Sequence, residues 1–243
     1  ACSLRVAASP LEGATPVARQ SRFHGVSGLI HFARCSVAVS VLGLAACGNT
    51  PQAPQWQMNA KGSAERATEA WLAGDSRVEM AEFARARAEV ARTGRADWVA
   101  RLELLRCATR VASLEFEPCT GFDALASDAA EAEKAYARYL NGAAAPGDAA
   151  LLPEAHRSLV AANAAPDAAL AAIQDPVSRL VAAGVLVRGG RATPGVVAQA
   201  VDTASARGWR RPLLAWLKVQ QQRAQAAGDA TAAAALQRRI DLV

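Results

Sequence analysis

The chain has 243 residues, which suits one domain or two small ones with a substantial core, so the fold does not depend on metal or disulfide support. Alanine dominates, aromatic residues make up 5%, and Arg outnumbers Lys by 24 to 3. Residues 48–243 contain 23 basic and 21 acidic residues. This near balance excludes a strongly charged body and gives no electrostatic case for nucleic acid as a partner.

The first part of the chain contains the elements of a targeting segment. Residues 36–46 include eight Ala, Val or Leu residues, with Arg34 before them and Cys47 directly after. A basic residue, a short apolar run and small residues at the cleavage point are typical of a secretory signal peptide. The run is too short to span a bilayer as a helix, which takes about 20 residues. We therefore expect residues 1–46 to be a leader that is cleaved between Ala46 and Cys47.

The four residues 44–47, Leu-Ala-Ala-Cys, resemble the lipobox of bacterial lipoproteins, in which Leu and two small residues precede an obligatory Cys. The resemblance implies a diacylglyceryl thioether on Cys47, cleavage before it, and a further acyl chain such as palmitate on its amine. Two or three chains anchor stably, since each buried methylene contributes about 0.8 kcal/mol. Gly48, where an Asp would favour inner-membrane retention, implies the outer membrane with the body in the periplasm; the inner membrane, the cell surface and an ordinary secretory signal are the alternatives.

Residues 1–25 do not fit a signal peptide, because their composition is mixed and shows no apolar period. A 46-residue leader is also long, and the chain does not begin with Met. We expect that the start is assigned too far upstream, that translation begins near Val26 or Leu29, and that residues 1–25 have no native structure.

After the lipidation site, residues 47–57 predict a polar, flexible tether rich in Pro, Gln and Asn. Residues 58–142 form a first helical part, in which Ser76 and Glu79 have the spacing of a capping box. The helix over 96–115 has the widest apolar face and is expected to be central. The expected helices of this part are about 59–73, 77–92, 96–115 and 127–140.

The Ala, Pro and Gly-containing stretch 143–150 is the best candidate for an internal boundary. The second helical part, residues 151–243, is either a separate domain or one domain with residues 58–142. Asp175 and Thr193 each stand directly before a Pro, the pattern of a capping residue followed by the first helical position. Prolines that precede expected helices in this part are Pro153, Pro166, Pro176, Pro194 and Pro212.

The end of the chain predicts a helical hairpin, with helices at about 212–227 and 230–242 joined at Gly228-Asp229. Such Ala-rich antiparallel pairs resemble tetratricopeptide-type hairpins, although there is no fixed 34-residue period and no Trp-Leu-Gly-Tyr pattern. The predicted fold is therefore all-α and built of antiparallel helical hairpins. A degenerate repeat-like array and an irregular bundle fit the pattern equally well.

Two cysteines, Cys107 and Cys119, remain in the body once Cys2 and Cys35 are removed with the leader. An oxidising periplasm favours a disulfide between them. The bridge requires the third helix to end early, because a helical residue rises 1.5 Å and the chain must turn back. Two separate buried thiols are the main alternative.

Catalytic chemistry has little support in the sequence. His156 is the single histidine after the leader, which argues against zinc and leaves a Cys–His nucleophile without nearby partners. Known phosphate-binding, nucleotide-binding and hydrolase motifs are absent from the sequence. Glu115 and Glu117 suggest a glycosidase pair, but a solvated helix end is the preferred interpretation. Charged residues predicted to flank the buried stripe at the surface are Arg101, Glu103, Arg106 and Arg110.

Tryptophans of the body lie beside helix ends or on apolar stripes, and core packing is the expectation for Trp71, Trp98, Trp209 and Trp216. The alternative is a peptide-binding groove in the C-terminal part. Its lining would be Trp209, Arg210, Arg211 and Trp216.

These observations together predict a membrane-anchored, non-enzymatic lipoprotein that acts as a scaffold, assembly factor or interaction module of the cell envelope. Expected partners are the membrane, through the lipid, and an envelope protein. We expect no catalytic residue, no metal, no nucleic acid and no small-molecule cofactor. A cell-wall enzyme and a passive structural lipoprotein are the alternative functions.

Overall fold

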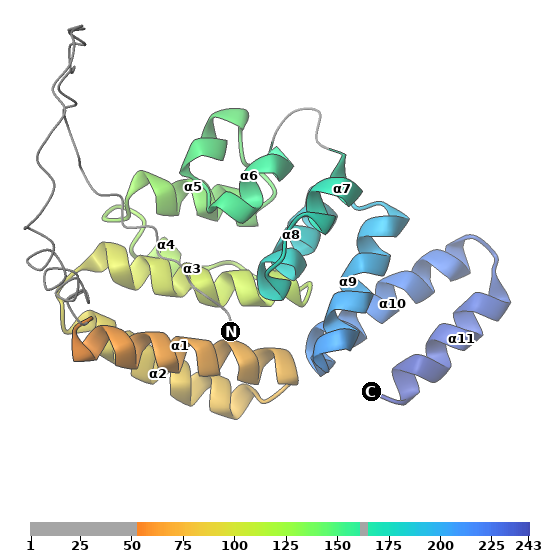
Figure 1. The fold of residues 1–243 in the computed structure, drawn as a ribbon, viewed down its shortest axis with the longest axis horizontal. Helices are drawn as coiled ribbons and strands as arrows, with labels where there is room; N and C mark the ends of the chain where they lie inside the picture. Colours follow the sequence, from red (N-terminus) through yellow and green to blue (C-terminus); the bar gives the residue numbers. More distant parts are fainter. Residues whose placement is uncertain (1–52, 161–164) are drawn as a thin grey trace, which may run out of the picture. The chain divides into compact units, whose positions relative to one another are not determined.

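The computed structural model describes residues 53–160 and 165–243, which are all-helical as predicted (Figure 1). Within these residues the chain forms eleven α-helices, one 3-10 helix and no strand. Residues 53–243 form one compact unit, so the stretch 143–150 does not separate two domains. The elements are α1 (Gln55–Ala73), α2 (Ser76–Ala91), α3 (Ala96–Ala112), α4 (Thr120–Asp123), α5 (Glu131–Leu140), η1 (Pro146–Leu151), α6 (Glu154–Val160), α7 (Pro166–Ala171), α8 (Pro176–Arg188), α9 (Pro194–Arg207), α10 (Arg210–Ala226) and α11 (Ala230–Asp241).

Helices α1 and α2 form the first hairpin, which turns at Gly74 in the left-handed region (φ 98°). The helix α2 is capped by Asp75, whose carboxylate accepts a hydrogen bond from the Val78 N–H over 3.0 Å. The predicted capping box is therefore wrong. Ser76 is the first helical residue, and Glu79 is buried rather than folded back over the helix start.

Helix α3 lies at the centre, packed against α1, α2, α5 and α8. It ends at Ala112, three residues earlier than predicted, because Leu114 adopts a left-handed conformation (φ 60°) and the Glu115 N–H donates to the Arg110 carbonyl. The early end turns the chain back along α3. The expected helix over 127–140 likewise starts late, at Glu131, since the preceding residues form turns.

The main hydrophobic core extends from Trp71 to Leu217 and so includes both helical parts of the chain. At the crossing of α3 and α8, a Cβ at Gly184 would lie 2.2 Å from the Val111 carbonyl oxygen, so only glycine permits this close approach. A second, smaller core of mainly small side chains lies between α1, α2 and α3. Residues 53–243 thus contain a complete core of their own.

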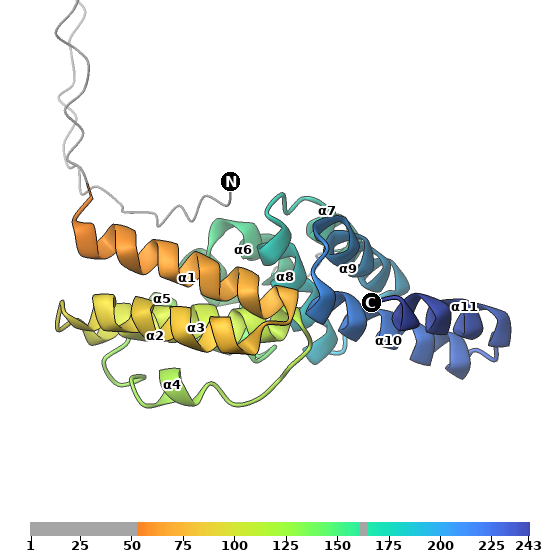
Figure 2. The same ribbon diagram turned by 90° about the horizontal axis from the view of Figure 1, so that it is seen from below.

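In the C-terminal part, three prolines occupy the first helical position as predicted. The side chains of Asp175 and Thr193 accept hydrogen bonds from the backbone N–H groups of Ser178 and Val196. Helices α8 to α11 each pack against the next, whereas α4 to α7 are short. Figures 1 and 2 both place the α10–α11 hairpin at the end of the unit opposite the start of α1.

Candidate functional site

The core packing expected for Trp209 and Trp216 is confirmed, so these residues do not line the alternative groove in the C-terminal part. Trp209 is 2% exposed and Trp216 is 0% exposed. The Trp216 indole N–H donates to the Ala112 carbonyl over 3.0 Å, and the Trp209 indole N–H donates to Glu69 over 2.9 Å. Both indoles therefore attach α10 to α3 and α1, where their large apolar area is best removed from water.

The two arginines of the predicted groove also have different surroundings. The Arg211 guanidinium lies 3.7 Å from the centre of the Trp71 ring, and the Arg110 guanidinium lies 4.2 Å from the same ring. Glu115 forms ion pairs with both arginines, at 3.5 and 3.8 Å. Arg210 is exposed and donates to the Val243 carbonyl. Arg211 thus belongs to the junction of α1, α3 and α10.

Charge is distributed unequally along the described unit. Residues 53–206 contain sixteen basic and nineteen acidic residues, whereas residues 207–243 contain seven basic and two acidic residues. The balanced total that argues against a charged body is therefore the sum of an acidic part and a basic part. Counting charges by segment rather than over the whole chain is the sequence signal that would have found this difference.

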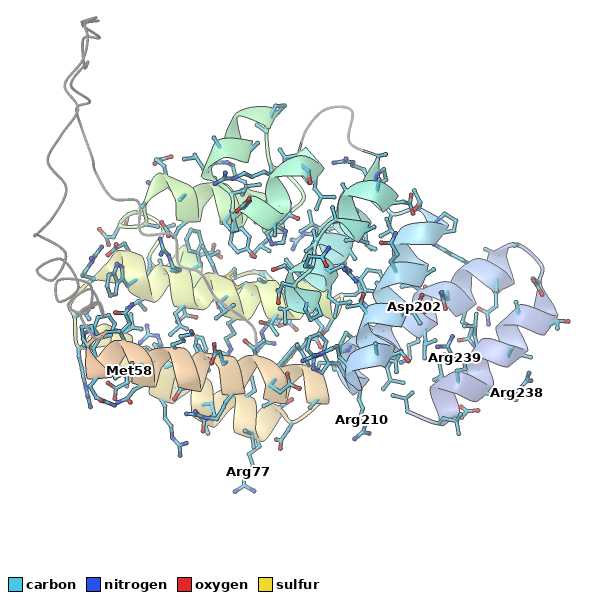
Figure 3. All side chains as sticks on the ribbon, viewed as in Figure 1. Met58, Arg77, Asp202, Arg210, Arg238 and Arg239 are labelled. Carbon is cyan, nitrogen blue, oxygen red and sulfur yellow. A yellow bond between two sulfur atoms is a disulfide. The ribbon has the colours of Figure 1, made fainter. Side chains whose placement is uncertain are left out.

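Helices α10 and α11 form what we call the basic hairpin. Lys218, Arg238 and Arg239 are exposed, and within residues 53–160 and 165–243 their side chains have no hydrogen bond or ion pair. Figure 3 shows Arg210 and Arg238 pointing away from the ribbon. In the described unit α11 packs mainly against α10, so much of the hairpin surface is uncovered. This surface is the candidate interaction site.

The prediction that four charged residues of α3 lie at the surface is correct for Arg101, which is exposed, and wrong for Glu103, which is buried; Arg106 and Arg110 are half-buried. Arg106 holds Glu79 of α2 through two hydrogen bonds, at 2.7 and 3.1 Å. Arg101 donates to Glu133 of α5 at 2.8 and 2.6 Å. Glu103 is itself buried and accepts a hydrogen bond from Arg87 of α2 at 2.8 Å. Buried carboxylates require such partners, so these pairs connect the helices.

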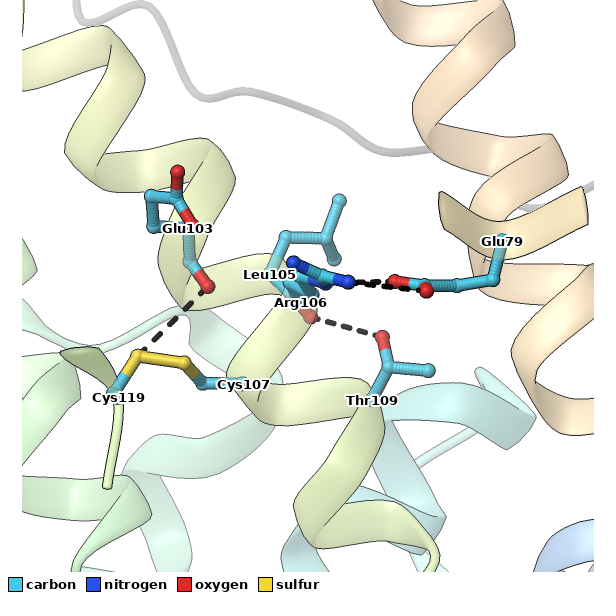
Figure 4. The surroundings of a disulfide bond; sticks show 7 residues. All are labelled: Glu79, Glu103, Leu105, Arg106, Cys107, Thr109 and Cys119. Carbon is cyan, nitrogen blue, oxygen red and sulfur yellow. Dashed lines mark hydrogen bonds and ion pairs between the residues drawn. A yellow bond between two sulfur atoms is a disulfide. The ribbon is translucent and has the colours of Figure 1, made fainter. Parts of the chain in front are cut away.

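A disulfide joins Cys107 and Cys119 in the structure, with Cα atoms 5.9 Å apart. Figure 4 shows the bridge beside α3, with the ion pair of Arg106 and Glu79 extending from the same helix toward α2. The early end of α3 brings Cys119 back alongside the helix. Since each sulfur is bonded to the other, neither cysteine is a thiolate nucleophile.

A cavity of about 190 Å³ lies beside the bridge, between α3, α4, α5 and the end of α8. This is smaller than most small-molecule sites, which measure roughly 300–1,000 Å³. Its lining includes three carboxylates, Glu103, Glu117 and Asp123, together with Arg110 and Arg188. The mixed charges make it the described feature that best fits an active site.

The carboxylates of this region do not form a free pair. Glu115 contacts Arg110 and Arg211, whereas Glu117 lines the cavity, so the two predicted neighbours lie in different surroundings. Glu103 is held by Arg87, and a Cβ at Gly121 would lie 2.2 Å from its Oε2 atom. That oxygen is therefore covered by the backbone of α4.

His156 is buried between α5 and α6, where a hydrogen bond of 3.0 Å joins its Nδ1 atom and the Tyr139 hydroxyl. Tyr136 packs against the same imidazole, with ring centres 5.9 Å apart. Burial lowers the pKa of His156 to about 4, and the negative charge of Asp175 opposes this shift. The imidazole is neutral at pH 7 and belongs to the core.

Cys47 and Ala46, the predicted lipidation and cleavage residues, lie outside the described residues. Among residues 53–160 and 165–243, no three His, Cys, Asp or Glu side chains gather in a group suited to a metal ion. No helix in this described part has the length and apolar character that crossing a membrane requires.

Comparison with known proteins adds no family to this description. No protein-family model, no curated protein sequence and no solved structure matches the chain.

Proposed function

We propose that the protein is a lipid-anchored component of the cell envelope that acts as a non-enzymatic interaction module, and that the basic hairpin binds an acidic surface of an envelope protein. The anchor is supported by the resemblance of residues 44–47 to a lipobox. The interaction role is carried by one observation: the side chains of Lys218, Arg238 and Arg239 are exposed and form no ion pair with any residue that the structure describes.

The chemistry of these cations supports binding rather than folding. In residues 53–206 most long-range ion pairs place a partly exposed Arg on a buried carboxylate, which connects helices. Cations without such a partner add little to stability, but they attract an acidic partner and raise the rate of encounter. The hairpin also stands at the end of the unit, where a partner has access to it (Figure 2).

A cell-wall enzyme is the second candidate, because a cavity with three carboxylates lies beside the disulfide. Its small volume and the engagement of Glu103 by Arg87 make it a poor site for a polymeric substrate. Loss of a hydrolytic activity in a Glu117→Gln variant would favour the enzyme.

The anchor is tested by substituting Cys47→Ser in the native cell. We expect the parent protein to float with the outer-membrane fraction and the variant to be soluble in the periplasm. Mass spectrometry of the parent should find a first residue carrying acyl chains. An unmodified thiol with the leader still attached would contradict the lipid anchor.

The interaction role is tested by crosslinking in the cell envelope with the triple variant Lys218→Glu, Arg238→Glu, Arg239→Glu. The matched control is Arg77→Glu, which reverses an exposed cation of α2 that has no ion pair in the described part of the chain. We expect one acidic partner to be captured by the parent and by the control, but not by the triple variant. Equal capture by all three would contradict the proposed site, and no specific partner at all would favour a passive structural lipoprotein.

A further inference from the structure

The start of α1 carries an unusual pair of tryptophans. The rings of Trp56 and Trp98 pack together with centres 5.0 Å apart, and both side chains are only half-buried. Met58, two residues further along α1, is 39% exposed and is labelled at this end of the helix in Figure 3. The other three tryptophans of the chain, Trp71, Trp209 and Trp216, are all buried. We call Trp56, Met58 and Trp98 the α1 tip.

The α1 tip lies at the start of the first described helix after Cys47. Seven residues, 48–54, lie between Cys47 and Gln55, the first residue of α1. The Cα atoms of Cys47 and Gln55 can therefore be at most about 29 Å apart, even in a fully extended chain. A lipid on Cys47 would therefore hold this end of the unit near the bilayer surface, while the basic hairpin lies at the opposite end (Figures 1 and 2).

The charged side chains around the α1 tip are paired with one another, and this limits the attraction of the tip for anionic lipid. Arg95 donates to Asp97 at 3.2 and 2.6 Å, and its guanidinium lies 4.2 Å from the Trp98 ring centre. Arg92 donates to Glu89 at 3.1 Å. Without surplus positive charge, the tip has no strong attraction for anionic lipid. Its affinity for a bilayer comes from the two indoles and from the lipid on Cys47, which holds the tip close to the membrane.

We infer that the α1 tip is the bilayer-contacting surface of the protein, with the Trp56 and Trp98 indoles in the headgroup region. Indole has an apolar body and a polar N–H, and tryptophan concentrates at this level of membranes. The inference rests on the proposed lipid anchor. It goes beyond that anchor by giving the domain a fixed orientation, with the basic hairpin directed away from the membrane and toward a periplasmic partner.

The test supplies the tether chemically, so that it does not depend on native acylation. Residues 47–243 are coupled through the Cys47 thiol to a maleimide lipid in phosphatidylcholine vesicles, and Cys47→Ser gives the uncoupled control. The vesicles contain lipids brominated either near the headgroup or near the chain end, and tryptophan fluorescence is measured. We expect the bromines near the headgroup to quench the fluorescence of the coupled protein and not that of the uncoupled control. The quenching would report on Trp56 and Trp98, because the remaining three indoles are buried.

Two variants make the outcome decisive. The double variant Trp56→Phe, Trp98→Phe should lose this quenching while its thermal unfolding remains cooperative. In that background Met80→Trp places an indole at an exposed position near the other end of α2, and it should not be quenched. Absence of quenching in the coupled parent would overturn the inference and leave the lipid anchor standing. Equal quenching of the Met80→Trp variant would also overturn it, since the protein would then have no preferred membrane face.

Discussion

Arginine side chains are used differently in the two ends of the domain. In α1 to α5, arginines such as Arg101 and Arg106 reach across to buried carboxylates on neighbouring helices. In the basic hairpin, Arg238 and Arg239 have no such partner within the described residues. The first arrangement connects helices, and the second leaves positive charge for another molecule.

The net charge of the whole chain therefore does not show where uncompensated positive charge lies on the surface of the domain. Several arginines of residues 53–206 are paired with buried carboxylates of other helices, whereas residues 207–243 contain only two acidic residues for seven basic ones. If the comparison is correct, substitutions in α1 to α5 change the free energy of unfolding. Substitutions of the hairpin cations change binding and leave that free energy almost unaltered.

The largest expected effect comes from removing the disulfide that closes the chain back on α3. The double variant Cys107→Ala, Cys119→Ala should lose about 3 kcal/mol of unfolding free energy, because the unfolded chain regains the entropy of a loop with a sequence separation of 12. Chemical denaturation measures this loss. A reducing agent should destabilise the parent and not the variant, and two reactive thiols in the unreduced parent would contradict the bridge.

The next effect tests the connection between α2 and α3. In an Arg106→Met variant Glu79 stays buried without its partner, and we expect a loss of about 2 to 3 kcal/mol. The control is Arg85→Met, since Glu82 keeps its second partner Arg66 and should lose less than about 1 kcal/mol. Equal losses in the two variants would mean that burial of Glu79 has no energetic consequence.

The buried His156 should make the free energy of unfolding depend on pH, with an effect of about 2 kcal/mol. Its pKa is about 4 in the folded chain and about 6.5 when unfolded, so the unfolded chain binds more protons between these values. Unfolding free energy should therefore fall by about 2 kcal/mol between pH 7.5 and pH 5. His156→Gln should remove this dependence. Asp148 acts at lower pH, because the Arg138 guanidinium and the Ala145 N–H hold its pKa at about 2.

The smallest effect is expected in the basic hairpin. Replacing Lys218, Arg238 and Arg239 by Gln should change the unfolding free energy by less than about 0.5 kcal/mol, because these side chains are exposed and unpaired in the described part of the chain. Thermal and chemical unfolding measure this. A substantial loss would show that the hairpin cations also hold the fold together, and the comparison between the two ends would fail.

Much of the fold was predictable because its signals are local. Proline at the first position of α7, α8 and α9, capping side chains at Asp175 and Thr193, and the turn at Gly228-Asp229 all act within about one helical turn. The end of α3 was missed because its left-handed residue is Leu114, and sequence patterns favour glycine for that conformation.

The candidate sites were less predictable, since they depend on residues far apart in the chain. The sequence predicted that Trp216 is a core residue, but not its partner, because Trp216 and Ala112 are 104 residues apart and meet only in the folded unit. Trp56 and Trp98 likewise form a pair only because α1 and α3 lie together. The separation of charge was present in the sequence, but its meaning depended on which carboxylates are buried.

The sequence by itself determined that this chain is helical, where several of its helices begin, and that its last two helices form a hairpin. Tertiary structure alone decided which charges are paired, which tryptophans are covered and how Cys119 reaches Cys107. The physical reason is that propensity and capping depend on neighbours within a few residues, whereas burial and ion pairing depend on distances across helices that no local pattern contains.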